Sequence, residues 1–220
     1  MNNGFADCST ARDELIDYLA DKVIKRLLFS IEVEASGRHV HLTRDNVETL
    51  FGKGHTLTWK SDLSQPGQFA CQERVTVLGP KQAIANVIVL GPERKEAQVE
   101  ISATDALTLG IKAPMRMSGT IAGTPGVKLI GSAGELELSR GVIVAKRHIH
   151  ATPEDAARFS VADNEEVDVT VFGERPVTFH DVTVRVSPSF AAYMHIDYDE
   201  ANACGYHKGL IGIIHKGRRD

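Results

Sequence analysis

The chain has few of the features that mark several common classes of protein. Its 220 residues include only three cysteines, Cys8, Cys71 and Cys204, an odd number at irregular spacing that predicts a reducing compartment without a disulfide framework. No apolar run is long enough to span a membrane, and the acidic start (residues 1–7) is no secretory signal, so no membrane role is expected. Aromatic residues make up only 6%, and the net charge of −4 excludes a general attraction to nucleic acid. The expected partner is a small molecule, met by local basic residues.

Two short segments share the pattern Arg-His-x-His. They are Ser36–His41 and Ala145–His150, and in each a β-branched residue separates the two histidines. Side chains alternate along a strand, so both imidazoles of a pair lie on one face, with Cα atoms about 7 Å apart. Such a pair can bind one metal ion, and imidazole ligands suit zinc. One pair alone would equally fit a half-exposed sheet surface, but two copies, each followed by a capped helix start, favour a metal.

Two histidines leave each metal ion short of protein ligands. Glu100 is the candidate to complete the first site, and His195 is the candidate to complete the second. Open positions on both ions would then remain for a substrate or water, which is typical of a catalytic site and not of a structural one. The six expected ligands are His39, His41, Glu100, His148, His150 and His195.

The segment from Ser9 to Phe29 has the apolar spacing of an amphipathic helix. Leu15, Leu19, Val23 and Leu27 recur every four residues and would form one stripe. This stripe must be buried somewhere, which leaves two alternatives. The helix packs on the body of the domain, or it docks into a groove of a partner.

The remainder of the chain, from Ile31 onward, has mostly the alternating pattern of short strands, with few helices. This composition favours closed or nearly closed β-barrels. His39 and His148 are 109 residues apart, close to half of the chain. Two related barrels that face each other would place both histidine pairs at a shared cleft. The expected fold class is mainly β, with short capping helices.

Three further segments have features of a binding site. Arg94, in the basic cluster Gly91–Lys95, would bind phosphate in a bidentate manner, or it is simply an exposed loop arginine. The glycine-dense stretch from Ser118 to Glu135 brings backbone amides close to a phosphate-bearing ligand, or it makes tight hairpins. The turn-rich segment from Gly52 to Gly67 is a plausible flap over a site.

The arginines that precede the two histidine pairs have a different expected role. Arg38 and Arg147 point to the face opposite the imidazoles. We therefore expect them to pair with acidic residues behind the site.

Five motifs together resemble one known family, the phosphotransacylases of propanediol utilisation, or phosphate propanoyltransferases. The resemblance covers roughly Ile31 to His215, with the motifs in the order of the family. The motifs are Ser-Gly-Arg-His-Val-His-Leu from Ser36, Gly-Pro-Glu-Arg-Lys from Gly91 through Glu100, Met117 to Gly126, Lys-Arg-His-Ile-His from Lys146, and Met194 to Ala203.

The resemblance implies an architecture. Two β-barrels are built from interleaved segments, one from residues 30–37 plus 146–220 and the other from residues 38–145. Residues 1–29 form a separate N-terminal segment. In the family such a segment commonly targets the interior of a bacterial microcompartment, which implies a bacterial cytoplasmic protein, possible shell or cargo partners through this helix, and a homo-oligomer.

The resemblance also implies an activity, the transfer of a propanoyl or acetyl group between coenzyme A (CoA) and phosphate at two zinc ions. His39, His41 and Glu100 would hold one zinc ion, and His148, His150 and His195 the other. Arg94 would bind phosphate, with Ser118 and Gly119 as further phosphate- or CoA-binding residues. No covalent acyl-enzyme is expected, which leaves Cys71 and Cys204 without a role.

Two alternatives remain open at this stage. A two-metal hydrolase acting on a phosphate- or thioester-containing substrate would use the same ligands to activate water. A shell scaffold protein would need no open metal position at all. The glycine-dense stretch and Arg94 favour a phosphate-bearing substrate over simple hydrolysis.

Overall fold

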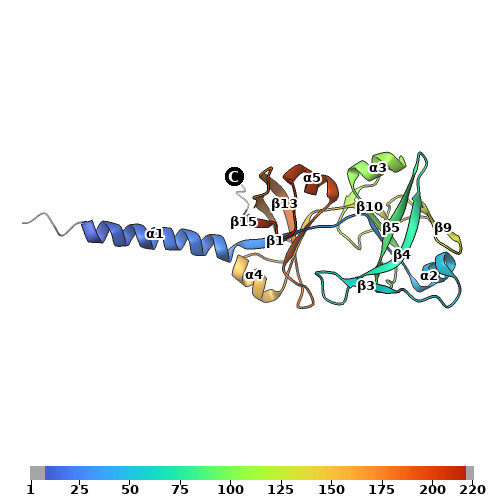
Figure 1. Ribbon diagram of the computed structural model, residues 1–220, viewed down its shortest axis with the longest axis horizontal. Coiled ribbons are helices and arrows are strands. Elements are labelled where there is room, and N and C mark those ends of the chain that lie inside the picture. Colours follow the sequence, from blue (N-terminus) through green and yellow to red (C-terminus); the bar gives the residue numbers. More distant parts are fainter. Residues whose placement is uncertain (1–7, 217–220) are drawn as a thin grey trace, which may run out of the picture.

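The computed structural model describes residues 8–216, so residues 1–7 of the expected N-terminal segment lie outside it (Figure 1). One half of the body is a barrel of six strands, closed in the order β1-β14-β11-β13-β12-β15. Alternate residues of each strand fill its interior; Val167, Val169 and Val171 of β12, for example, are all buried. The strands are β1 (Ser30–Ala35), β11 (His148–Ala151), β12 (Glu166–Val171), β13 (Val177–Val186), β14 (Tyr193–Ile196) and β15 (Ile211–Lys216).

The other half is a curled sheet with its own core, in the order β7-β10-β6-β2-β5-β4-β8-β9, with β3 paired to β4. The expectation of a second closed barrel is wrong, because β7 and β9 remain edges within the described residues. The two-residue β7 pairs only with β10, and helix α2 (Arg44–Phe51) lies against β9. The strands are β2 (His39–His41), β3 (Trp59–Asp62), β4 (Phe69–Leu78), β5 (Ala83–Gly91), β6 (Gln98–Ile101), β7 (Met115–Arg116), β8 (Val127–Ile130), β9 (Glu135–Leu138) and β10 (Val142–Ala145).

The chain passes between the two halves at two short connections. Residues 36–38 lead from β1 of the barrel to β2 of the curled sheet, and residues 146–147 lead from β10 of the sheet back to β11 of the barrel. Each connection runs directly into one of the histidine pairs. Both pairs therefore begin their strands at the junction between the halves.

Short capped helices follow the strands of the site, as expected from the residues after each histidine pair. Thr43 caps α2 and Thr152 caps α4 (Pro153–Phe159), and each threonine side chain accepts a backbone hydrogen bond from the third helical residue. The same device, with Ser102 and Asp197 as caps, begins α3 (Ala103–Leu109) and α5 (Tyr198–Cys204).

Helix α1 (Cys8–Leu28) projects away from the barrel (Figure 1). Only Phe29 separates it from β1, so no chain is available to turn the helix back onto the body. Its apolar stripe remains exposed, from 52% at Leu19 to 65% at Leu27, and the alternative in which it packs on the domain is not observed. Within the described residues, no helix combines the length and apolarity needed to cross a membrane.

Candidate active site

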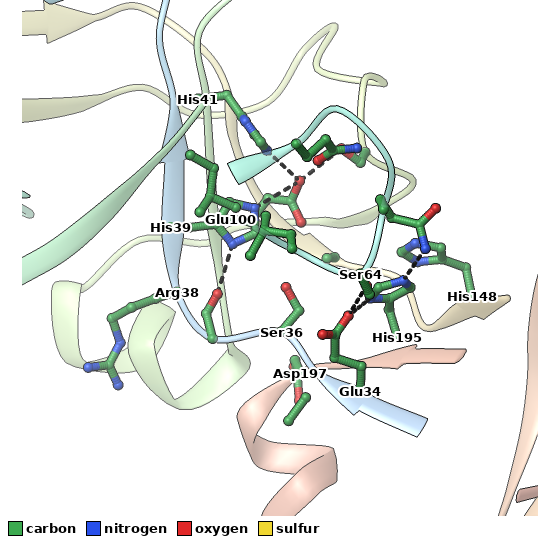
Figure 2. Close-up of a pocket in the computed structure, with 18 of the residues that line it drawn as sticks. Glu34, Ser36, Arg38, His39, His41, Ser64, Glu100, His148, His195 and Asp197 are labelled. Atoms are coloured by element: carbon green, nitrogen blue, oxygen red, sulfur yellow. Dashed lines mark hydrogen bonds and ion pairs between the residues drawn. The ribbon is translucent and has the colours of Figure 1, made fainter. Parts of the chain in front are cut away.

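The first histidine pair meets Glu100 because of strand register. Strand β2 pairs with β6 in antiparallel fashion, which sets His39 opposite Glu100 and His41 opposite Gln98. Side chains directly opposite each other share a face of the sheet. The candidate ligand atoms of His39, His41 and Glu100 all lie within 4.8 Å of one another, and the three residues are buried (Figure 2).

Hydrogen bonding orients His39 toward the carboxylate. Its Nδ1 donates to the carbonyl oxygen of Gly37 at 2.8 Å, which leaves Nε2 facing Glu100 at 3.5 Å. Burial alone would raise the pKa of Glu100, but the neighbouring imidazoles outweigh it and the pKa is lowered well below its usual range. Burial lowers the pKa of His41, and His39 lowers it further. An ionised carboxylate beside imidazole nitrogens is a donor set that fits zinc.

The second histidine group is assembled in the same way. Strand β11 pairs with β14, and His148 stands opposite His195. The ring centroids of His148 and His150 are 4.6 Å apart, and those of His150 and His195 are 4.9 Å apart. His148 Nδ1 donates to the carbonyl of Lys146 at 2.9 Å, which repeats the bond that His39 makes two residues back along the chain.

The imidazoles of this second group remain neutral. Burial, together with the other histidines, lowers the pKa of His150 to about 2 and that of His195 to about 3. The buried Nδ1 of His150 has no hydrogen-bond partner among the described residues. Neutral imidazoles fit a metal ion. Within residues 8–216, however, only the group around Glu100 has its ligand atoms within 4.8 Å of one another.

Both groups open into one cavity of about 600 Å³ between the barrel and the curled sheet. All the residues expected from the sequence to form the site line this cavity. They are His39, His41, Arg94, Glu100, Ser118, Gly119, His148, His150 and His195.

Ser118 connects the first histidine group to Arg94. Its hydroxyl donates to Glu100 Oε1 at 2.8 Å, accepts from Gln98 Nε2 at 2.9 Å and lies 3.5 Å from a nitrogen of Arg94. Burial lowers the pKa of Arg94, and the nearby guanidinium of Arg185 adds to this effect. The arginine is therefore part of the cavity wall and not an exposed loop residue.

The glycine-dense stretch has more than one role. The Gly119 amide, expected to contact phosphate or CoA, donates to Gln98 Oε1 at 2.8 Å. A Cβ atom at Gly126 would lie 1.9 Å from the carbonyl oxygen of Leu138, so this glycine allows two backbone segments to pack closely. Close backbone packing, and not contact with a ligand, explains Gly126.

Arg185 and Gln65 also line the cavity, although no sequence motif contains them. Arg185 stands on β13 beside His150, and its guanidinium lies over the ring of Phe190 at 5.6 Å from the centroid. Gln65 lies in the β3–β4 loop, inside the expected flap, and is buried. An arginine on an alternating strand and a glutamine in a turn-rich loop give no periodic signal, so only their contacts in the folded structure reveal them.

The two arginines that precede the histidine pairs form ion pairs with acidic residues, as expected. Arg38 pairs with Asp105 at 2.8 Å and Arg147 pairs with Glu200 at 2.9 Å. Burial raises the pKa of the Cys71 thiol to about 11, so it is unreactive at neutral pH.

Comparison with known proteins relates this cavity to a family. A model of the phosphate propanoyltransferase family matches residues 32–207, which include every residue lining the cavity. The chain belongs to the phosphate propanoyltransferase family. The matched region begins within β1 and ends after α5, so α1 lies outside it.

Curated members of the phosphate propanoyltransferase family are similar over nearly their whole length. The phosphate propanoyltransferase of Clostridioides difficile (strain 630) is 58% identical over 206 residues, covering 93% of this chain and 99% of the relative. That of Listeria monocytogenes serovar 1/2a is also 58% identical over 206 residues, with 93% and 97% covered. That of Thermotoga maritima is 53% identical over 186 residues, with 84% and 89% covered.

Proposed function

We propose that the protein is a zinc-dependent phosphate acyltransferase that moves a propanoyl or acetyl group between CoA and inorganic phosphate. The observation that carries this proposal is the single cavity in which both histidine groups meet Arg94 and Ser118, in a chain of this family. The named activity of the relatives supports it, and nothing in their names favours the hydrolase alternative.

His39, His41 and Glu100 are proposed to hold one zinc ion, and His148, His150 and His195 a second. The fit rests on the neutral imidazoles of the second group, the ionised carboxylate of Glu100 in the first, and the orienting bonds of His39 and His148 to backbone carbonyls. Zinc ions bound in these groups would stabilise the CoA thiolate and polarise oxygen atoms of the substrates.

The arginines of the cavity are proposed to bind the phosphate. Four basic side chains line it, but Arg38 is paired with Asp105 and Lys146 with Glu166. Among the described residues, Arg94 and Arg185 have no such carboxylate partner within ion-pair distance. A phosphate between these two guanidiniums would relieve their mutual repulsion and accept charge-assisted hydrogen bonds.

Binding both substrates in one cavity orients them before they react. Arg94 and Arg185 hold the phosphate so that one of its oxygen atoms faces the carbonyl carbon of the thioester. A bond forms between these two atoms, the carbon–sulfur bond breaks, and the electron pair leaves with the CoA sulfur. Ser118 holds Glu100 and lies beside Arg94, which couples the phosphate site to the first histidine group.

We further propose the larger organisation implied by the family. Residues 30–37 plus 146–220 and residues 38–145 would act as two domains on either side of the cavity, and residues 1–29 as a separate segment. That segment would mediate assembly into a homo-oligomer and contact a microcompartment shell or its cargo enzymes. The exposed stripe of α1 supports this docking role.

The test is the phosphate dependence of CoA release. The full-length protein, incubated with propanoyl-CoA or acetyl-CoA, should release free thiol only when phosphate is present, with an acyl phosphate trapped by hydroxylamine. Sulfate at the same ionic strength is the control. Equal thiol release without phosphate would identify a hydrolase and refute the proposal.

A further inference from the structure

Glu34 stands next to His195 by strand register. Strand β1 pairs with β14 in parallel, and the aligned partners are Glu34 and His195. The Glu34 carboxylate oxygen Oε2 lies 3.4 Å from His195 Nδ1 (Figure 2). Neither the family motifs nor the expected ligand set includes Glu34. Glu32, two residues earlier on the same face of β1, does not line the main cavity.

The hydrogen bonds of Gln65 determine which nitrogen of His195 carries the proton. Gln65 Oε1 accepts from the backbone N–H of Ala191 at 3.2 Å, and Gln65 Nε2 donates to the Ala191 carbonyl at 3.0 Å. A backbone N–H can only donate and a carbonyl can only accept, so the orientation of the amide is unambiguous. The same Gln65 Nε2 lies 3.3 Å from His195 Nε2, which must therefore be the acceptor. In a neutral imidazole the proton then resides on Nδ1, facing Glu34.

The first histidine of each pair also carries its proton on Nδ1. His39 Nδ1 donates to the carbonyl of Gly37 and His148 Nδ1 to that of Lys146, so each presents Nε2 to the cavity. Within residues 8–216, no carbonyl oxygen accepts a hydrogen bond from His195 Nδ1, and a carboxylate faces this nitrogen instead. A carboxylate in that place is the strongest common partner for orienting a ligating imidazole and raising its basicity.

Glu34 also contacts the loop between β3 and β4. Its Oε2 accepts a hydrogen bond from the hydroxyl of Ser64, the residue before Gln65. The loop thus meets the barrel on both sides of His195, through Ser64 at Glu34 and through Gln65 at Ala191. The loop belongs to the curled sheet and the two acceptors belong to the barrel.

We infer that Glu34 is a positioning residue, which faces the Nδ1–H that Gln65 imposes on His195, protects this proton from solvent and ties the β3–β4 loop to the barrel through Ser64. The expected effect of Glu34 on metal binding rests on the proposed function, since it concerns the proposed zinc ion of the second histidine group. The tautomer itself does not depend on that function. Two readouts therefore separate a failure of this inference from a failure of the zinc proposal.

The decisive readout is the imidazole N–H signal of His195 in the full-length protein as purified. With ¹⁵N-labelled histidine, the signal is assigned by its absence from His195→Gln. The wild type should show a slowly exchanging proton on Nδ1. In Glu34→Ala this proton should exchange faster with solvent, in Glu34→Gln it should stay slow because the amide oxygen still accepts, and Glu32→Ala should match the wild type. An unchanged exchange rate of the Nδ1 proton in a folded Glu34→Ala protein would overturn the inference.

The second readout is metal release to a chromogenic chelator. Removing an orienting partner of a ligating histidine typically weakens metal binding about 10- to 100-fold. In Glu34→Ala, one metal equivalent should be released at correspondingly lower chelator concentration, while the other equivalent and the Glu32→Ala control should be unchanged. Release of both equivalents as in the wild type would overturn the positioning role at the metal. If the wild type holds a single metal equivalent, the second zinc site is refuted. The N–H signal of His195 would still test the positioning role of Glu34.

Discussion

Arg94 and Arg185 face the cavity from opposite halves of the molecule. Arg94 follows β5 in the curled sheet, and Arg185 lies on β13 of the barrel. A guanidinium cannot lose its charge at neutral pH, so two of them at one cavity favour an anionic ligand. The positions of both side chains are set by backbone bonds, such as that of the Arg94 N–H to the carbonyl of Leu42 at 2.8 Å.

Replacing Arg94 should affect phosphate more than the thioester. Arg94→Ala removes charge-assisted hydrogen bonds, each worth about 1.5–3 kcal/mol, so the KM for phosphate should rise about 10- to 100-fold. The KM for acyl-CoA should change much less. Steady-state kinetics with each substrate varied in turn measure both. The exposed neighbour Lys95 provides the control, and Lys95→Ala should behave as the wild type. Equal increases for both substrates would exclude a specific phosphate role.

Removing one histidine from either group should remove one metal ion. His39→Ala and His148→Ala each delete one of three ligands, so each protein should hold about one zinc equivalent in place of two and lose most of its activity. Metal analysis of protein never exposed to chelator measures this stoichiometry. His207 is exposed and lies outside the cavity, so His207→Ala should retain both equivalents. Near-full activity in either of the first two variants would contradict the two-ion site.

At the scale of elements, α1 differs from every other helix of the chain. Helices α2 to α5 each bury two or three residues against a sheet, whereas the apolar stripe of α1 is more than half exposed. An exposed stripe of this length contributes nothing to the stability of the body and is costly in water. This exposure supports the proposed docking role of α1.

Deleting residues 1–28 should leave the body folded. The deletion retains Phe29, whose carbonyl accepts from Ile214 in β15 at 2.9 Å, so the barrel seam stays closed. We expect the melting temperature to change by less than about 2 °C, because little buried area is lost, and the activity to persist. Light scattering should show a smaller assembly than for the full-length chain. A large fall in melting temperature would contradict the docking role of α1.

At the scale of the whole molecule, the cavity depends on contacts that join the two halves. Besides the two connecting segments, the Thr104 N–H at the start of α3 donates to Asp199 in α5 at 2.8 Å. Gln65 adds two bonds from the β3–β4 loop to Ala191 in the barrel. These contacts fix the distance between the histidine groups, which neither half could determine alone.

Loss of Gln65 should release the β3–β4 loop. Gln65→Ala removes both bonds to Ala191, so backbone amides of residues 63–68 should exchange with deuterium faster, while the barrel strands keep their protection. Hydrogen exchange followed by mass spectrometry measures each segment. Gln72 on β4 is exposed and provides a matched control, since Gln72→Ala should leave the loop unchanged. Unaltered exchange in the Gln65 variant would show that other contacts hold the loop.

Local chemistry is what the sequence alone determined. The alternation of a strand places His39 and His41 on one face, and a threonine followed by acidic residues begins a helix, wherever the segment lies in the fold. These features depend only on neighbours within a few residues. The motifs of the family are equally local, so the sequence alone is enough to predict the candidate ligands.

Long-range register and closure were decided only by the tertiary structure. Whether a sheet closes depends on hydrogen bonds between its edge strands. The residues of β7 and β9 do not by themselves predict that these two edges stay unpaired with each other. Gln65, Arg185 and Glu34 acquire their roles from partners 126, 35 and 161 residues away, at Ala191, His150 and His195. Such contacts leave no periodic trace, because the chain positions they join are unrelated until the sheets form.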